Sequence, residues 1–135
     1  MDLVQQLRRD EGVRHSPYLD SRGVLTVGVG RNLRDVPFSD DEINLMLVND
    51  IKDKMKQLSA FEWYNTLDDV RKAAVTNWAF NVGVHGLLGF PHAIAALAKK
   101  DWATANTEMM DSAWSRQVGE RANRLAKQIL TGEWQ

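Results

Sequence analysis

Hydrophobic residues recur every three or four positions over most of the chain, and this spacing predicts a mainly helical protein. The longest such run follows the capping-box sequence Ser-Asp-Asp-Glu at 39–42, which also places acids in a first helical turn. The run continues as one apolar stripe as far as Leu58. We therefore expect a single long helix over 39–58.

A shorter amphipathic helix is expected at the start of the chain, over 3–11. Leu3, Leu7 and Glu11 are spaced four apart, so on a helix they lie along one face that would turn toward the core. Gly12 follows directly and is a plausible residue for ending this helix.

From residue 66 onward, the same spacing and several capping signals predict a series of shorter helices. Thr66, followed three residues later by Asp69, is expected to cap the first of them. The second half of that helix, 73–82, is apolar nearly all round and should run through the middle of the core. The expected helices cover 67–82, a short turn between 83 and 89, 91–100, 102–110, 112–116 and 119–130.

Residues 12–38 differ in composition, because proline and glycine interrupt a run rich in β-branched and aromatic residues. Asp-Ser-Arg-Gly at 20–23 has the composition of a type I turn joining two short strands, and a third short strand is expected within 32–37. The predicted architecture is α+β, mostly α. A small antiparallel lobe (12–38) would be joined by the long helix to a larger helical lobe (1–11 and 59–135).

Length and composition fit one domain of 135 residues, with 44% apolar and 26% charged residues. A net charge of -1 argues against a general nucleic-acid binder, and the lack of cysteine excludes disulfides and thiolate chemistry. No apolar run approaches the roughly 20 residues of a membrane span. The first residues also lack the apolar core of a secretory signal, so we expect synthesis in the cytoplasm without stable membrane insertion.

Three side chains near the N-terminus are the main candidates for chemistry. Glu11 lies on an apolar helix face, Asp20 opens a polar turn, and Thr26 lies in the strand that follows. Two carboxylates in different environments can divide acid and base roles, one protonating a leaving oxygen while the other activates water. The simpler interpretation is a helix-end acid paired with an arginine, a turn-forming Asp and a β-branched strand residue.

Other motifs argue against cofactor chemistry. Gly28 and Gly30 form G-x-G, but no third glycine and no helix follow, so close approach of the backbone to another group explains them better. His15, His85 and His92 lack a metal-ligand spacing, and no serine lies in G-x-S-x-G. We expect neither a metal nor a cofactor.

Aromatic and basic residues of the C-terminal half have both structural and functional explanations. Trp63 and Tyr64, between two helices, are expected either to anchor a loop to the core or to stack on a sugar. The tryptophans of the helical faces are expected in the core: Trp78, Trp102, Trp114 and Trp134. The basic residues form either a solvated face or the source of an arginine for the acidic site: Arg116, Arg121, Arg124 and Lys127.

Taken together, the chain resembles the phage-type lysozymes, the endolysins of glycoside hydrolase family 24. The resemblance begins with LRRDEGVRHSPYLDSRGVLTVGVG, where Glu11, Asp20 and Thr26 fall at the catalytic spacing of the family. It continues through LDDVRKAAVTNWAFNVGVHGLLGF and the region of Trp102 and Trp114, and it closes on RANRLAKQILTGEW. Nearly the whole chain is covered.

The resemblance implies a lysozyme-like fold and a muramidase. Such an enzyme cleaves, with inversion, the β-1,4 bond between N-acetylmuramic acid and N-acetylglucosamine in bacterial peptidoglycan. Glu11 would be the general acid, and Asp20 would be the base or would orient the attacking water, which Thr26 would help to hold. Arg121 resembles an arginine that contacts the catalytic Glu from the C-terminal lobe.

The resemblance also implies substrate contacts and a biological setting. Phe80 resembles a cleft-lining aromatic residue. Gly30 is expected to take part in substrate binding as well. The protein would be a monomer with peptidoglycan as its partner. It would be bacteriolytic and antimicrobial, and it would act in host cell lysis. It would wait in the host bacterial cytoplasm and reach the periplasmic wall with the help of a holin.

Three departures from the family pattern stand out. Arg31 occupies a position where many relatives have His, so the ion pair made by that His is either missing or replaced. Asn81 stands where a longer amide is found in the best-known relative. The segment between Gly30 and Ser39 is short, which should trim the small lobe and open the cleft.

Two other functions fit the same residues. A lytic transglycosylase would use the muramyl 6-hydroxyl in place of water and would need only the acid, so Asp20 and Thr26 argue against it. A wall-binding module without turnover would carry the same fold without the activity. Membrane disruption by the basic C-terminal helix is a separate and weaker hypothesis.

Overall fold

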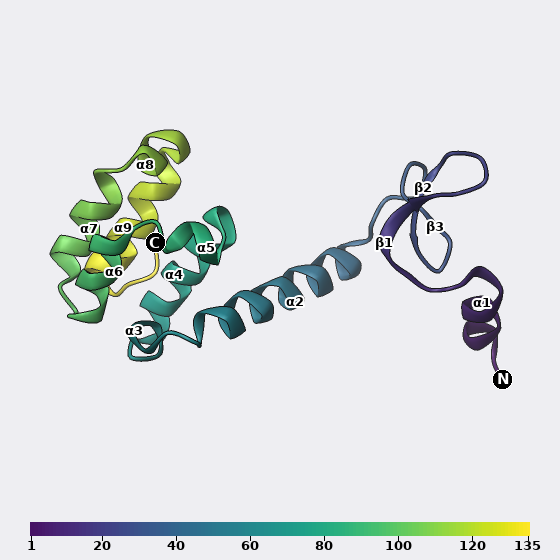
Figure 1. The fold of residues 1–135 in the computed structure, drawn as a ribbon, viewed down its shortest axis with the longest axis horizontal. Coiled ribbons are helices and arrows are strands. Elements are labelled where there is room, and N and C mark those ends of the chain that lie inside the picture. The colour runs from purple at the N-terminus through teal and green to yellow at the C-terminus, as the bar shows by residue number, and fades with distance from the viewer. The chain divides into compact units, whose positions relative to one another are not determined.

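In the computed structural model, which describes residues 1–135, the chain divides into two units. Unit 1 is Met1–Leu45 and unit 2 is Met46–Gln135 (Figure 1). The predicted assignment of residues to two lobes stays a prediction. The α+β, mostly helical architecture is confirmed.

Unit 1 begins with the predicted helix α1 (Leu3–Glu11). Asp2 caps it, because the Asp2 carboxylate accepts from the backbone N–H of Gln5 while the Gln5 side chain accepts from that of Asp2. Gly12 follows the helix with a φ of 75°, a conformation that favours glycine. Leu3 and Leu7 are exposed within this unit, and the predicted turn of their stripe toward the core stays a prediction.

A three-stranded antiparallel sheet of order β1-β2-β3 follows α1 in unit 1. Its strands are β1 (Arg14–Leu19), β2 (Leu25–Gly28) and β3 (Arg31–Asn32). The predicted turn at 20–23 joins β1 to β2, and the N–H of Gly23 donates to the carbonyl of Asp20 over 2.9 Å.

The third strand was expected within 32–37, and this position is wrong. Strand β3 ends at Asn32, because the side chain of that residue turns the following chain away from the sheet. Its Oδ1 accepts from the backbone N–H groups of Arg34 and Asp35, which makes an Asx-type turn.

The predicted long helix is α2 (Asp40–Leu58), which starts in unit 1 and ends in unit 2. Its capping box is formed as expected, since the Ser39 N–H donates to Glu42 Oε1 over 2.9 Å and the Glu42 N–H donates to Ser39 Oγ over 3.2 Å. Most of its apolar stripe is exposed, and only Leu58 is buried.

Unit 2 is helical, and it contains each helix that the sequence predicted from residue 67 onward. These helices are α4 (Asp69–Val82), α5 (Val84–Leu87), α6 (Pro91–Ala98), α7 (Trp102–Met110), α8 (Ala113–Val118) and α9 (Glu120–Thr131). One further turn, α3 (Glu62–Asn65), precedes them and holds Trp63 and Tyr64. No helix has the length and apolar character that crossing a membrane requires.

The predicted cap of the first long helix in unit 2 is wrong. Helix α4 is capped by Asp68, not Thr66, because the Asp68 carboxylate accepts from the N–H of Arg71 and pairs with its guanidinium. Thr66 instead ends α3, where its hydroxyl donates to the carbonyl of Trp63.

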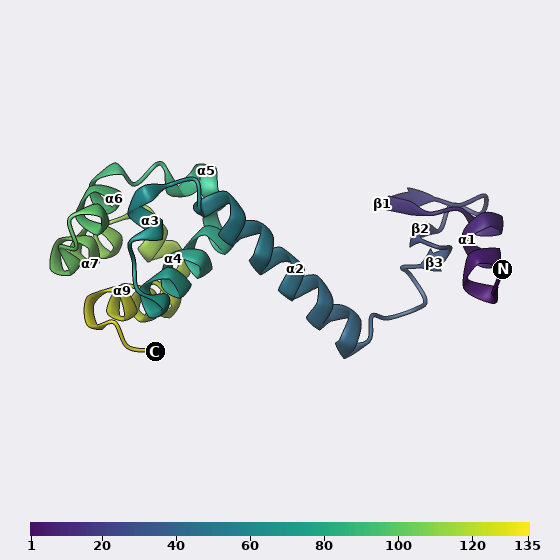
Figure 2. The ribbon, with the colours of Figure 1, turned by 90° about the horizontal axis from the view of Figure 1, so that it is seen from below.

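Helix α4 runs through the core of unit 2, as its apolar second half predicted. Helix α9 packs against both α4 and α7 (Figure 2). The buried ring of Trp78 lies 4.8 Å from that of Phe90 and 5.3 Å from that of Trp114. These contacts account for the buried aromatic centre of the unit.

The other aromatic residues follow the core prediction with one exception. Trp102 and Trp63 are partly buried against the core, and Tyr64 is buried with its hydroxyl 3.1 Å from that of Thr76. Trp134 is 70% exposed, so its expected place in the core is wrong. It follows Gly132, whose left-handed conformation ends α9 and directs the last residues away from the helix.

Candidate active site

Glu11, the last residue of α1, lies against the turn that joins β2 to β3. A Cβ added to Gly30 would stand only 3.1 Å from Glu11 Oε2, so the carboxylate occupies the space that a side chain would fill. Gly30 also has a φ of 66°, which strains any other residue. The structure thus gives this glycine the role of admitting Glu11, and its predicted contact with substrate stays a prediction.

Asp20 occupies the turn between β1 and β2 and is held by backbone donors. Its Oδ1 accepts from the N–H of Arg22 over 2.8 Å and from that of Val24 over 2.9 Å. The hydrogen bond from Val24, then the N–H and charge of Arg22, lower the pKa of Asp20 below its ordinary value. Its Oδ2 makes no hydrogen bond within the chain, so this ionised carboxylate has one oxygen available for water or substrate.

Thr26 lies in the middle strand, paired across the sheet with Tyr18 on one side and Asn32 on the other. It is only 4% exposed, and its hydroxyl donates to the carbonyl of Val24 over 2.9 Å. Because its proton is engaged there, the Thr26 oxygen is oriented to act as an acceptor. Val24 therefore positions both Asp20 and Thr26, one through its N–H and the other through its carbonyl.

Arg31, the residue that departs from the family pattern, pairs with Glu42. Arg31 Nη2 lies 2.7 Å from Glu42 Oε2, and Nη1 donates to Oε1 over 3.2 Å. The backbone N–H of Ser39 is the main cause that lowers the pKa of Glu42 to about 2, and Arg31 adds to it. An ion pair is thus present at position 31, and its equivalence to the one made by His in relatives stays a prediction.

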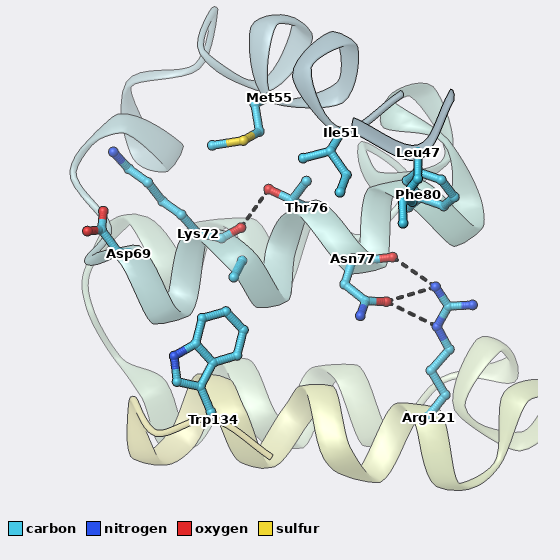
Figure 3. Close-up of a pocket in the computed structure, with 11 residues that line it drawn as sticks. Leu47, Ile51, Met55, Asp69, Lys72, Thr76, Asn77, Phe80, Arg121 and Trp134 are labelled. Atoms are coloured by element: carbon cyan, nitrogen blue, oxygen red, sulfur yellow. Dashed lines mark hydrogen bonds between the residues drawn. The ribbon is translucent and has the colours of Figure 1, made fainter. Parts of the chain in front are cut away.

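Unit 2 contains an open cavity of about 520 Å³ beside α4 (Figure 3). Phe80 and Arg121, the two predicted site residues of this unit, both line it. Most of its other walls are apolar and come from α2, α4 and the end of the chain: Leu47, Ile51, Met55, Ala73 and Trp134. The expected role of Phe80 in binding substrate stays a prediction.

Asn77 of α4 holds the guanidinium of Arg121, a contact that the sequence did not reveal. Arg121 Nε and Nη2 donate to Asn77 Oδ1 over 3.1 and 2.8 Å, and Nη2 also donates to the Asn77 carbonyl over 3.2 Å (Figure 3). Arg121 Nη1 makes no hydrogen bond within the chain. Glu11 belongs to the other unit, so its contact with Arg121 stays a prediction.

Asn81, one turn further along α4, has a partner of its own. Its Oδ1 accepts from the indole N–H of Trp114 over 2.7 Å. The shorter amide at this position therefore reaches a buried aromatic residue. Asn77 and Asn81 are spaced four apart and could have been grouped from the sequence as one polar face of α4.

The three histidines are scattered over β1, α5 and α6. The structure contains no group of three or more histidine, aspartate or glutamate side chains arranged to hold a metal ion.

Glu11, Asp20 and Thr26 all lie in unit 1, on α1, the β1–β2 turn and β2. Glycoside hydrolases work with a pair of carboxylates that flank the scissile bond. The chain belongs to the phage lysozyme family, whose model matches residues 8–128. That match includes all three of these residues.

Individual relatives come from a phage and from a eukaryote. The chain is 29% identical to probable T4-type lysozyme 1 of Dictyostelium discoideum and 26% identical to probable T4-type lysozyme 2, covering 96% of this chain and 94% of each relative. It is 27% identical to the pre-baseplate central spike protein Gp5 of Enterobacteria phage T4, over 98% of this chain.

The lengths of these relatives differ from that of this chain. The chain spans 28% of the Gp5 protein, which is much longer. Each alignment covers 161 residues, more than the 135 of this chain, so the relatives carry residues that this chain lacks. The predicted shortening between Gly30 and Ser39 stays a prediction.

Proposed function

We propose that this protein is a muramidase that hydrolyses the β-1,4 bond between N-acetylmuramic acid and N-acetylglucosamine in bacterial peptidoglycan. The observation that carries the proposal is the family match over residues 8–128, which includes Glu11, Asp20 and Thr26. The geometry around Asp20 supports it, because an ionised carboxylate with an unbonded oxygen suits a group that must accept a proton from water.

In the proposed reaction, Glu11 donates its proton to the glycosidic oxygen as the bond from that oxygen to the anomeric carbon breaks. A water molecule held by Asp20 and Thr26 attacks the anomeric carbon and gives a proton to Asp20. The products are a new reducing end and a free 4-hydroxyl on the neighbouring sugar. Attack from the face opposite the leaving group inverts the anomeric centre, which needs carboxyl groups about 6.5–9.5 Å apart.

Two residues of unit 2 are proposed to support this chemistry. Phe80, exposed in the wall of the cavity, would contact a sugar ring. Arg121 would stabilise the Glu11 carboxylate, and its fixed guanidinium with an unbonded Nη1 supports that role.

The test is the Glu11→Gln variant, measured as loss of turbidity of permeabilised Gram-negative cells. A neutral amide cannot donate the proton, so we expect the rate to fall roughly 10²- to 10⁴-fold. Asp10→Asn is the matched control, since Asp10 is the adjacent exposed acid and pairs only with Arg9. Lysis by Glu11→Gln at the wild-type rate would exclude Glu11 as the general acid.

Mass spectrometry of the released muropeptides separates hydrolysis from the transglycosylase reaction. Reducing muramic ends are expected, whereas anhydro-muramic ends would contradict the use of water. Sedimentation with purified sacculi in the absence of any released reducing sugar would instead indicate a wall-binding module.

We further propose that the activity serves host cell lysis, with the protein held as a monomer in the bacterial cytoplasm until a holin opens the membrane. The phage relative supports a phage setting, although the Dictyostelium relatives place similar chains in a eukaryote. Expression in a bacterial host with and without a holin tests this, since lysis is expected only when both are present.

A further inference from the structure

The Gly30 turn is fixed on both of its sides. On one side the Glu11 carboxylate lies against Gly30, where an added Cβ would be 3.1 Å from Oε2. On the other side the next residue, Arg31, starts β3 and reaches Glu42 in the first turn of α2. Glu11, the general acid of the proposed reaction, therefore lies against Gly30, and the residue after Gly30 forms an ion pair.

This ion pair has the geometry of a two-pronged contact. Two guanidinium nitrogens of Arg31 meet the two oxygens of Glu42, at 2.7 and 3.2 Å. The Arg31 guanidinium also lies over the ring of Phe38, 5.8 Å from its centroid, and its backbone pairs with Val27. Such a fork fixes orientation as well as distance, which a lysine ammonium cannot do.

Glu42 is also held in place by Ser39, independently of Arg31. Its Oε1 accepts from the N–H of Ser39, and its own N–H donates to the Ser39 hydroxyl. One carboxylate thus completes the cap of α2 and binds β3. The helix end and the strand are thereby tied through a single side chain.

The short connector makes this contact possible. Only residues 33–38 separate β3 from the cap of α2, and Asn32 folds their start into a turn by accepting from two backbone N–H groups. The connector keeps the first turn of α2 within reach of Arg31, which is eleven positions before Glu42.

We infer that Arg31 and Glu42 are positioning residues for Glu11: their ion pair fixes the Gly30 turn, and the turn sets where the Glu11 carboxylate lies. The inference rests on the proposed role of Glu11 as general acid. Neither residue transfers a proton in this scheme. Small displacements of a catalytic group reduce the chemical step strongly, and a 1 Å shift can cost about 10²-fold.

The test uses Glu42→Gln and Arg31→Met. Glutamine retains the carbonyl oxygen that caps α2, so Glu42→Gln removes the charge of the ion pair and leaves the capping box in place. We expect kcat on soluble peptidoglycan fragments to fall about tenfold in each variant, with KM changed less than about twofold. The double variant should be no slower than the slower single variant, because both changes break one contact.

Arg31→Lys and Arg116→Met are the controls. Lysine keeps the charge without the fork, so Arg31→Lys should recover part of the lost kcat. Arg116 is an exposed arginine of α8 in unit 2, so Arg116→Met removes the same charge elsewhere and should leave kcat unchanged.

A second measurement follows Glu11 directly and does not depend on turnover. The ¹³C signal of the Glu11 carboxyl should move in Glu42→Gln and in Arg31→Met but not in Arg116→Met. If the wild type hydrolyses nothing, the proposed function fails and this signal still decides the positioning role. Wild-type kcat in both variants, a kcat loss that matches only the unfolded fraction, or an unmoved Glu11 signal would each overturn the inference.

Discussion

Gly30 shows how one missing side chain leaves room for the proposed general acid, Glu11. Gly28 and Gly30 have nearly the same φ, 67° and 66°, but only Gly30 has another group where its Cβ would be. Substitutions at the two glycines therefore separate the effect of backbone strain from the effect of contact with Glu11.

We predict that Gly30→Ala lowers kcat several-fold more than Gly28→Ala does. Both variants carry the strain of alanine at positive φ, roughly 1–2 kcal/mol, and should unfold at similar urea concentrations. Only Gly30→Ala also pushes Glu11 Oε2, which stands 3.1 Å from the added carbon. Equal kcat values for the two variants would show that the contact has no influence on the reaction.

Local chemistry made some site residues predictable and left others hidden. The Asp20 turn follows from Asp and Gly at the ends of a four-residue sequence, and the strand position of Thr26 follows from that turn. The partner of Arg31 could not be predicted in this way, because the contact depends on how residues 33–38 fold back. Asn77 and Arg121 were hidden for the same reason, being 44 positions apart.

At the scale of elements, the cap of α2 is a pH-dependent contribution to stability. The pKa of Glu42 is lowered to about 2 from an ordinary value of 4.5, so the folded state favours its charged form. That contribution is fully present above pH 4.5 and is lost as pH falls from there through 2.

We predict that wild type melts at a higher temperature than Glu42→Gln at pH 6–7, and that the difference shrinks steadily below pH 4.5. Circular dichroism melts in a series of buffers measure this, and the two proteins should converge near pH 2. A difference that stays constant across the series would mean that the Glu42 charge contributes nothing and that only its shape matters.

The bounds of α1, α2 and α7 were predictable to within a residue. The start of α4 was misplaced because Thr66 and Asp68 compete within one turn. Asp68 prevails because its carboxylate binds both the N–H and the guanidinium of Arg71. That guanidinium also donates to the carbonyls of Ile129 and Leu130 at the end of α9, a contact that no local pattern indicates.

At the scale of the whole molecule, burial is distributed unequally between the units. Only Val24 and Thr26 are buried in unit 1, whereas unit 2 contains the continuous core around Trp78. Local opening is easiest where few apolar groups are buried. The proposed catalytic residues therefore lie in the part of the chain with the smaller core.

We predict that the backbone amides of α4 and α9 exchange with deuterium far more slowly than those of β1, β2 and β3. Native-state hydrogen exchange followed by NMR measures this residue by residue. Protection of the β2 amides equal to that of α4 would mean that the two units open only together.

The sequence predicted the helices and strands of this molecule better than it predicted the contacts between residues far apart in the chain. Periodicity and caps predicted the helices, and the family resemblance supplied the candidate site residues. The burial of Trp134 was mispredicted, because the spacing of apolar residues does not show that the chain leaves the helix at Gly132. The predicted contact of Glu11 with Arg121 likewise depends on structure beyond any local pattern.

The distribution of aromatic residues also determines what spectroscopy can detect. All five tryptophans lie in unit 2, from Trp63 to Trp134, while Tyr18 and Phe38 are the aromatic residues of unit 1. A melt followed by tryptophan emission thus reports the helical unit, and unit 1 has no tryptophan of its own to report order around Glu11. An inactive sample with an unchanged fluorescence melt can therefore be disordered in unit 1, and Tyr18 is the natural probe with which to recognise it.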